Sequence, residues 1–159
     1  MSNLTIRHAN AGDIDAIMEL LRQVNDVHAR GRPDLFIEGK TKYTPTELAQ
    51  IIADDSRPIF VATDTDSTLL GYAFCMDENH AGANNLQPVR TLYIDDICVD
   101  ERARGKHVGT ELYDHVLDYA RAHGYHNVTL NAWAANPAAV KFYESLGMSV
   151  YRYGMEQIL

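Results

Sequence analysis

The residues best suited to chemistry lie within one short stretch, from Asp95 to Thr110. Two adjacent carboxylates, Asp95 and Asp96, interrupt an apolar run that has the length and composition of a strand. A turn rich in glycine and cationic side chains follows and leads directly into a segment with helical periodicity. Carboxylates can accept protons, and the free amides at the start of a helix bind anions. The stretch therefore combines a candidate general base with a candidate phosphate site.

The turn between these two elements has the features of a phosphate-binding site. The first amides of a helix have no partner within the helix, and the helix dipole adds positive character to that end. Glycines allow the backbone to approach a ligand closely, and basic side chains nearby add charge. The spacing fits neither the Walker A nor the dinucleotide-binding glycine pattern, so an ordinary helix start with solvated charges is the alternative. The residues assigned to ligand binding here are Arg104, Gly105, Lys106, His107, Val108, Gly109 and Thr110.

The rest of the chain alternates between strand-like and helix-like patterns. Apolar runs, some of them alternating, predict strands at residues 4–9, 58–64, 69–77, 89–100, 126–133 and 148–159. Apolar positions with a period of 3.6 predict helices at residues 13–30, 44–54, 106–123 and 136–146. This order of elements predicts an α/β fold with a single mixed, mostly antiparallel sheet that carries helices on both faces.

Composition and length predict one globular domain over residues 1–159. The chain is 46% hydrophobic and 23% charged, and it is long enough for one full core. We expect no membrane span and no secretory signal, because the longest apolar runs have the length of strands. Cys75 and Cys98 lie inside apolar runs, which is typical of buried thiols in a cytoplasmic protein. The formal net charge of −8 disfavours a nucleic-acid partner.

Two segments resemble the motifs of the GNAT superfamily of N-acyltransferases. RGKHVGTELYDHVLDYA, which begins at Arg104, is similar to the acyl-CoA-binding signature, and Arg104 and Gly109 match its first and last positions. The middle glycine of that signature is replaced by His107. NPAAVKFYESLGM, at residues 136–148, resembles the closing motif of the superfamily. Both motifs occur in the family's order, and the order of elements agrees with the family from Leu4 to the C-terminus.

The resemblance implies an N-acetyltransferase that uses acetyl-CoA as co-substrate. It places the pyrophosphate at the 104–110 turn and the pantetheine arm beside the strand backbone at Ile97, Cys98 and Val99. Asn136 precedes Pro137 at a predicted helix start, so it serves either as the helix cap alone or also as a hydrogen-bonding partner of the cofactor arm.

Acetyl transfer from a thioester to an amine needs a proton acceptor, because a primary amine with a pKa near ~10.4 is mostly protonated at neutral pH. Asp95 and Asp96 are the candidates. We favour Asp95, because strand alternation gives it the parity of Ile97 and Val99 and because similar polyamine-acetylating enzymes place their proposed base at this offset. Asp96 would then point to the other face and orient the substrate or bond to the backbone. A water chain as the base, or two acids that simply end the strand in solvent, are the alternatives.

The thiolate that leaves during acetyl transfer needs a proton donor. Its basicity resembles that of a Cys thiol, roughly 8.5 as a pKa, so a phenol with a pKa near ~10 can protonate it while remaining neutral itself. The resemblance places Tyr143 at the family's usual position for this acid. The alternative for Tyr143 is a packing role on the last predicted helix.

The irregular segment HARGRPDLFIEGKTKY, residues 28–43, is predicted to form part of the wall for the amine acceptor. Long irregular segments between well-marked helices commonly carry function. The candidate acceptor-binding residues are His28, Asp34 and Phe36. The acceptor itself stays open between a small amine, a peptide N-terminus and a lysine side chain.

The sequence leaves a second function and several partners open. A non-catalytic, acyl-CoA-binding regulatory domain is the alternative to an enzyme, and the exchange of a motif glycine for His107 is its one hint. A longer acyl group and a homodimer also remain options. The seven His residues show no spacing typical of a metal site, so we predict no metal.

Overall fold

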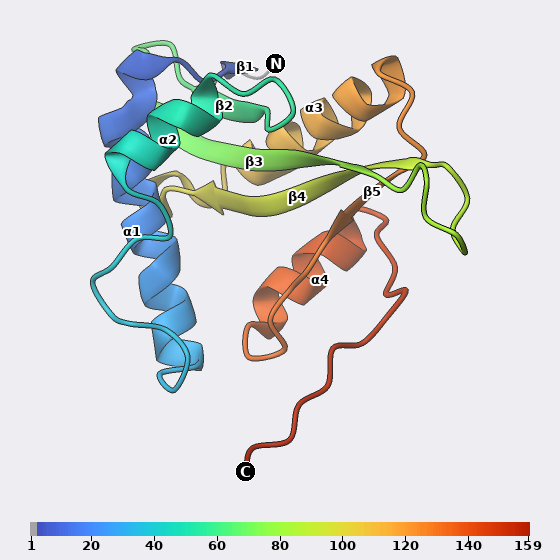
Figure 1. The fold of residues 1–159 in the computed structure, drawn as a ribbon. Helices are drawn as coiled ribbons and strands as arrows, with labels where there is room; N and C mark the ends of the chain where they lie inside the picture. The colour runs from blue at the N-terminus through green and yellow to red at the C-terminus, as the bar shows by residue number, and fades with distance from the viewer. Residues whose placement is uncertain (1–2) are drawn as a thin grey trace.

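The computed structural model describes residues 3–159 of the chain and shows a central sheet with helices packed around it (Figure 1). Its strands are β1 (Thr5–His8), β2 (Ile59–Thr63), β3 (Leu69–Asn79), β4 (Arg90–Val99) and β5 (Asn127–Leu130). Its α-helices are α1 (Ile14–Gly31), α2 (Pro45–Ile52), α3 (Val108–Ala122) and α4 (Pro137–Ser145). Two short 3-10 helices are η1 (Ala11–Asp13) and η2 (Glu101–Ala103).

The strands form one sheet in the order β1-β2-β3-β4-β5. Neighbouring strands are antiparallel from β1 to β4, whereas β4 and β5 are parallel. A parallel neighbour needs a crossover connection, which α3 supplies between β4 and β5. α1 and α2 pack on one face of the sheet and α3 packs on the other (Figure 1). The predicted mixed, mostly antiparallel sheet with helices on both faces is therefore confirmed.

Alternation along the strands builds a separate core on each face. In β2, Ile59 and Val61 pack with α1 and α2, whereas Phe60 and Ala62 pack with α3. Every residue of β2 is buried, because helices cover it from both sides. The central strands are thereby fixed from above and below, and they offer a rigid base for side chains at their ends.

The two cysteines are buried thiols, as the sequence predicts. Cys75 in β3 belongs to the core on the α3 side, and Cys98 in β4 belongs to the core on the α1 and α2 side. Burial raises the pKa of each thiol to about 12. Both groups therefore stay protonated at neutral pH, which makes them poor nucleophiles.

The helix starts follow their local sequence signals. The Thr44 hydroxyl accepts a hydrogen bond from the Glu47 amide at 3.2 Å, and the Glu47 carboxylate accepts one from the Thr44 amide at 2.9 Å. The Asn136 side chain accepts a hydrogen bond from the Ala139 amide at 3.3 Å, so its predicted role as a helix cap is confirmed. No helix within residues 3–159 combines the length and hydrophobicity needed to cross a membrane.

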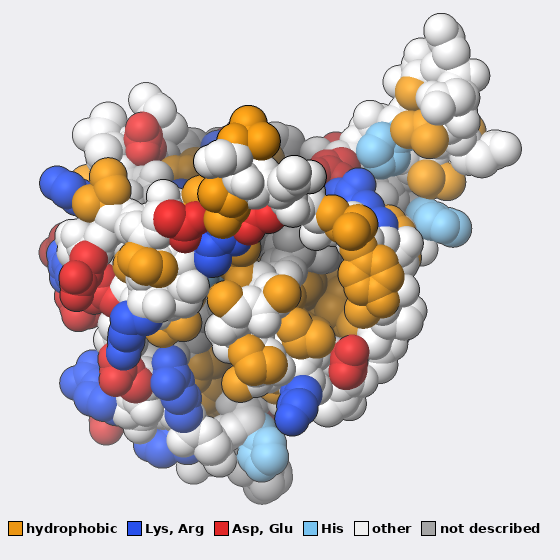
Figure 2. All heavy atoms as spheres, turned by 90° about the horizontal axis from the view of Figure 1, so that it is seen from below, with side chains coloured by type: hydrophobic (Ala, Val, Ile, Leu, Met, Phe, Trp, Pro, Cys, Tyr) orange, Lys and Arg blue, Asp and Glu red, His pale blue; other side chains and the backbone are white. Residues whose placement is uncertain are grey.

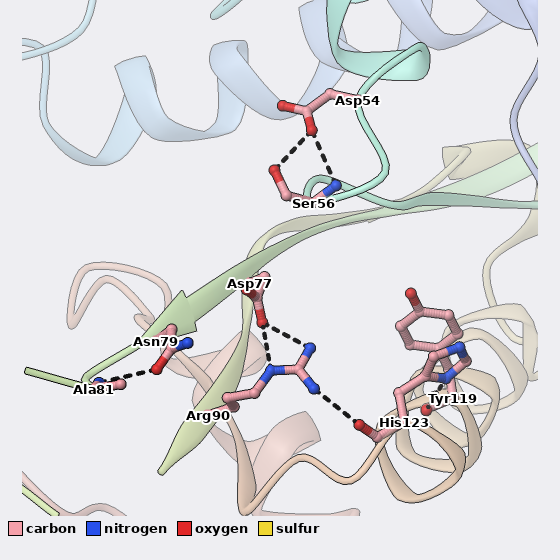
Figure 3. A network of polar contacts seen from close by, with 8 residues as sticks. All are labelled: Asp54, Ser56, Asp77, Asn79, Ala81, Arg90, Tyr119 and His123. Atoms are coloured by element: carbon pink, nitrogen blue, oxygen red, sulfur yellow. Dashed lines mark hydrogen bonds and ion pairs between the residues drawn. The ribbon is translucent and has the colours of Figure 1, made fainter. Parts of the chain in front are cut away.

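Arg90 fixes the start of β4 against its neighbours (Figure 3). Its guanidinium donates to Asp77 Oδ1 in β3, from Nη2 at 3.1 Å and from Nε at 3.3 Å. Its Nη1 donates to the carbonyl oxygen of His123, just after α3, at 3.0 Å. The network joins β3, β4 and the end of α3 at the start of β4. The candidate catalytic residues lie in the second half of the same strand.

The predicted strand at residues 148–159 is wrong. These residues form neither helix nor strand, and most of their large side chains are exposed. An extended segment becomes a strand only when another strand accepts its backbone hydrogen bonds, and the segment runs away from the sheet (Figure 1). β5 is consequently an outer strand of the sheet.

Gly71 in β3 allows α3 to approach the sheet, and this generates a prediction about stability. A Cβ atom at Gly71 would lie 2.8 Å from the Cys98 carbonyl oxygen and 3.2 Å from Val108 Cγ1. We expect Gly71→Ala to lower the free energy of unfolding by about 1–3 kcal/mol in urea titration. Gly154→Ala is the control, because a Cβ there meets no atom within 4 Å. Equal stability of both variants would contradict the close approach.

Candidate active site

A bulge in β4 sets the direction of the two adjacent carboxylates. Ile94 pairs with Cys75 of β3, and Asp96 pairs with the next residue, Phe74, so Asp95 is an extra residue in β4. The extra residue breaks the alternation, and both carboxylates therefore lie on the face that α1 and α2 cover. The prediction that Asp96 points to the opposite face from Asp95 is wrong, because it assumed an uninterrupted strand.

Asp95 is held by two side chains from the end of the irregular segment 28–43. Lys42 Nζ donates to Asp95 Oδ1 at 2.7 Å, and the Tyr43 hydroxyl donates to Asp95 Oδ2 at 2.7 Å. Arg57 in turn donates to the Tyr43 hydroxyl at 3.2 Å. Both carboxylate oxygens are thus engaged, which fixes the end of the segment against β4.

Asp96 lies in a different environment. It is largely buried, and Asp96 Oδ2 accepts a hydrogen bond of 2.6 Å from the hydroxyl of Tyr72, a fully buried residue of β3. Burial raises the pKa of Asp96 from 3.8 to about 6, the Tyr72 hydrogen bond opposes this rise, and the charge of Asp95 adds to it. A carboxyl group with such a pKa can take up and release a proton near neutral pH.

Tyr143 on α4 faces the same region of β4. Burial raises the pKa of its hydroxyl well above the usual range, and the nearby charge of Asp96 and the Cys98 thiol contribute to the rise. The phenol therefore remains protonated at any physiological pH and can donate a proton or a hydrogen bond. α4 thus brings a proton donor to the strand that carries the carboxylates.

The end of β4 has an open edge on the side of β5. β5 pairs with β4 from Thr91 to Ile94 only, where Ile94 lies opposite Leu130. Beyond this point β4 continues to Val99, and its residues 97–99 pair with β3 alone. The backbone of Ile97, Cys98 and Val99 is therefore available on one side, as expected for a strand that accepts an extended ligand.

The turn from residue 104 to 110 presents free amides. His107 is the N-cap of α3 in the left-handed conformation, with φ of 61°, and its side chain does not cap the helix. The amide of Glu111 donates to the His107 carbonyl oxygen at 3.1 Å, which leaves the amides of Val108, Gly109 and Thr110 without a partner inside the helix. Gly105 has a positive φ of 82° as well. Arg104 and Lys106 are exposed beside these amides.

Gly109 joins this turn to α4. A Cβ atom there would lie 3.0 Å from Phe142 Cζ and 3.5 Å from Val99 Cγ2. The neighbouring residue of α4 is Tyr143, so the packing of Phe142 on Gly109 fixes the helix that carries the candidate acid. A side chain at residue 109 would require the ring of Phe142 to shift.

A cavity of about 370 Å³ lies between the end of α1 and the start of α4. His28, Phe36 and Trp133 line it, and their rings contact each other, with centroids 5.0 Å apart for His28 and Phe36 and 5.4 Å apart for Phe36 and Trp133. Asn136 reaches the same cavity. Burial lowers the pKa of His28, and the Lys42 charge lowers it further, so its imidazole is neutral at pH 7.

Asp34 does not belong to this group of residues. Its carboxylate binds the Arg32 guanidinium through two hydrogen bonds of 2.9 and 2.7 Å and is absent from the cavity lining. Of the three predicted acceptor-binding residues, His28 and Phe36 therefore lie together at the cavity, whereas the Asp34 side chain binds the guanidinium of Arg32.

Comparison with known proteins shows a family to which the chain is similar along most of its length. The model of the Acetyltransferase (GNAT) family matches residues 19–148.

The chain belongs to the GNAT family of acetyltransferases.

Two curated relatives are N-acetyltransferases. An uncharacterised N-acetyltransferase of Methanocaldococcus jannaschii is 28% identical over 143 residues, which cover 90% of this chain and 59% of that protein. N-alpha-acetyltransferase 30 of Schizosaccharomyces pombe is 32% identical over 95 residues, which cover 58% of each chain. The aligned part of this GNAT chain thus spans less than three fifths of either relative.

Solved structures share the fold along nearly the whole chain. The crystal structure of a mutant Bacillus halodurans protein has a TM-score of 0.93 at 27% identity and covers 98% of this chain and 99% of that one. Glucosamine-6-phosphate N-acetyltransferase from Arabidopsis thaliana has a TM-score of 0.71 at 24% identity, with 99% of both chains covered. The second likeness concerns the fold alone.

Several residues of the candidate site were missed from the sequence. Tyr72, which binds Asp96, comes from β3, and no spacing links it to β4. Lys42 and Tyr43 are in the segment that was expected to bind the acceptor, although both bind Asp95. Trp133 carried one usable signal, since it is the single Trp and precedes the predicted helix at residue 136.

The absence of a metal stays a prediction. Within residues 3–159, no three side chains of His, Cys, Asp or Glu come together in a way that could hold a metal ion.

His107 supplies a test of the turn. For residues other than glycine, the left-handed conformation costs roughly 1–2 kcal/mol, and β-branched side chains tolerate it least. We expect His107→Val to reduce the free energy of unfolding by roughly that amount relative to His107→Gly, as measured by urea titration. Both variants lack the imidazole, so the difference isolates the backbone. Equal stability of the two would contradict a left-handed residue 107.

Proposed function

We propose that the chain transfers the acetyl group of acetyl-CoA to a primary amine, by direct attack of the amine on the thioester. The observation that carries the proposal is that a carboxyl group with a raised pKa, Asp96, and a neutral phenol, Tyr143, lie in the same region beside the open edge of β4. Membership of the GNAT family supports the reaction class.

The residues at the 104–110 turn suit the phosphates of acetyl-CoA. Backbone amides of Val108, Gly109 and Thr110 would donate to the pyrophosphate, and Arg104 and Lys106 would add positive charge. The free backbone of residues 97–99 would hydrogen-bond to the amide groups of the pantetheine arm. The co-substrate supplies the thioester, whose carbonyl carbon accepts the amine.

Asp96 is the better candidate for the base than Asp95, which the sequence favoured. Both carboxylate oxygens of Asp95 already accept a hydrogen bond, one from Lys42 and one from Tyr43. Asp96 accepts a hydrogen bond from Tyr72 and has a pKa of about 6, which matches a proton acceptor at neutral pH. In this scheme Asp95 positions the segment 28–43 and keeps the pKa of Asp96 raised through its charge.

The proton balance uses one base and one acid. Asp96 accepts a proton from the ammonium group of the substrate, directly or through a water molecule, and the neutral amine then forms the C–N bond. Tyr143 donates its proton to the thiolate as the C–S bond breaks, the nitrogen passes its surplus proton back to the Tyr143 oxygen, and Asp96 releases its proton to solvent. A base that is partly ionised near neutral pH and an acid that is fully protonated are the protonation states that this reaction needs.

The alternative, a regulatory domain that has lost its chemistry, is not favoured by any feature of the site. Its one hint was the replacement of a motif glycine by His107. His107 nevertheless adopts the left-handed conformation at the helix start, with φ of 61°, so the turn keeps a geometry that glycine would also adopt.

The cavity beside α1 is our proposed acceptor site. His28, Phe36 and Trp133 provide an aromatic wall suited to an apolar or cationic group. A peptide N-terminus is supported by the relative named N-alpha-acetyltransferase 30, and a small amine stays the second option. Both acceptors present the primary amine that the chemistry requires.

The acceptor is tested by acetyl-CoA consumption in the presence of N-terminal peptides, polyamines, amino acids and aminoglycosides. We expect turnover with at least one class, and we expect Phe36→Ala to raise the acceptor KM several-fold while the KM for acetyl-CoA changes little. Asp34→Asn is the control, because Asp34 lies outside the cavity lining. A change confined to the KM for acetyl-CoA would contradict the placement of the acceptor.

The base is tested by the pH dependence of kcat/KM. A base with a pKa of about 6 makes activity rise with pH and level off above that value. Asp96→Asn should lower kcat/KM by about a hundredfold or more and remove this limb. Asp95→Asn should retain the limb but shift it to lower pH, because the negative charge that raises the Asp96 pKa is gone. A limb that disappears in Asp95→Asn and persists in Asp96→Asn would reverse the assignment.

The acid is tested with Tyr143→Phe, which removes one hydroxyl and keeps the ring. We expect acetyl-CoA binding, measured by calorimetry, to change little and turnover to fall on the order of a hundredfold. Tyr113→Phe is a matched control on α3, outside the site. If Tyr143→Phe turns over at the wild-type rate while chemistry is rate-limiting, Tyr143 is a packing residue.

A further inference from the structure

The cavity proposed as the acceptor site is lined by positive charge. Arg30 and Arg32, at the end of α1, line it beside the aromatic rings, and neither Asp nor Glu is among the described residues of its lining. Figure 2 views the molecule from the side on which α4 lies and shows hydrophobic side chains with basic and acidic ones beside them. The whole chain has a formal net charge of −8, so a lining whose charged side chains are both cationic contrasts with the rest of the protein. Such a site attracts anionic groups and repels cationic ones.

Arg32 already holds a carboxylate from a distant part of the chain. Its Nη1 lies 2.6 Å from Glu156 Oε1, and its Nη2 donates to Glu156 Oε2 at 3.1 Å. Two parallel contacts of this kind are the geometry in which a guanidinium recognises a carboxylate. Asp34 binds the other edge of the guanidinium, which Nε and Nη2 form. The edge that carries Nη1 therefore fits a second carboxylate, and Glu156 marks its position.

The contact with Glu156 can be exchanged with a small loss of free energy. The Glu156 side chain is 55% exposed, and the segment 148–159 that carries it forms neither helix nor strand. Ion pairs at the surface contribute little, because water solvates both partners when they separate. A different carboxylate in the place of Glu156 would leave the charge around Arg32 unchanged.

We propose that the amine acceptor carries a carboxylate and that Arg32 binds it in the place that Glu156 takes in this structure. The inference rests on the proposed transfer of an acetyl group to an amine. The aromatic rings of the cavity would pack on the apolar part of the acceptor, and Arg30 would add positive charge. The carboxylate could belong to an acidic side chain near a peptide N-terminus or to a free amino acid. Polyamines and aminoglycosides, which carry several positive charges, would be repelled.

Paired ligands test the carboxylate subsite by binding alone. Calorimetry near neutral pH would compare amidated tetrapeptides that carry one glutamate, at each of the four positions in turn, with their glutamine counterparts. A second arm would compare free amino acids with their amides, which distinguishes the two sources of the carboxylate. The protein is loaded with coenzyme A, so that no acetyl transfer takes place. We expect at least one carboxylate ligand to bind about tenfold more tightly than its neutral counterpart, because it forms charge-assisted hydrogen bonds with the guanidinium.

A double-mutant cycle assigns this preference to Arg32 and Glu156. Arg32→Gln should reduce the preference to about twofold or less, because it removes the charge that binds the carboxylate. Glu156→Gln should tighten the binding of carboxylate ligands several-fold, because it removes the competing carboxylate, and it should have no such effect when Arg32→Gln is also present. Arg121→Gln is the matched control and should keep the preference, since Arg121 is an exposed residue of α3, on the opposite face of the sheet.

The outcomes separate this inference from the proposed reaction. Equal binding of both members of every pair, which includes no binding of either, would overturn the inference. A preference that persists in Arg32→Gln, or unchanged binding in Glu156→Gln, would overturn it as well. Turnover of neutral amines without any preference would leave the proposed reaction standing and reduce Arg32 to an anchor of the C-terminal segment. A preference without turnover of any ligand would support the carboxylate subsite and contradict the proposed reaction.

Discussion

The cost of ionising a carboxyl group away from water is the constraint on which this site depends. Asp96 is largely buried, and its hydrogen bond to Tyr72 offsets only part of the loss of solvation, so its pKa rises to about 6. The same shift in pKa makes the stability of the folded protein depend on pH. Because the pKa in the folded state lies above the ordinary value of 3.8, the protonated form stabilises the protein at low pH, and that contribution is lost as pH rises from about 4 through 6.

The bulge in β4 is the structural device that creates this environment. One extra residue turns Asp95 and Asp96 toward the same helices, where they meet different partners. Asp95 binds a lysine and a tyrosine from the segment before α2, whereas Asp96 binds the buried hydroxyl of Tyr72. Two neighbouring acids thereby meet different environments, which is what the proposed division into a positioning residue and a base requires.

The sequence contains the information for most of the elements but not for these partnerships. Hydrophobic periodicity and helix caps are local properties of the sequence, and they predict the helices and the order of elements from which the mixed sheet follows. The face of Asp95 was predicted wrongly, because a bulge arises from the pairing of β4 with β3 and leaves no mark in a single strand. The contacts of Lys42 and Tyr72 escaped notice because they join residues far apart in the chain. The expected strand at residues 148–159 depends on a neighbour that the chain itself does not place there.

The protonation of Asp96 is the central claim, and it can be measured without any substrate. Carbon-13 NMR of the carboxyl groups, with the Asp96 signal assigned by its loss in Asp96→Asn, follows the ionisation of this one side chain as pH is varied. The account predicts an apparent pKa of about 6 for Asp96. A midpoint at or below 3.8, the ordinary value for an aspartate, would contradict it.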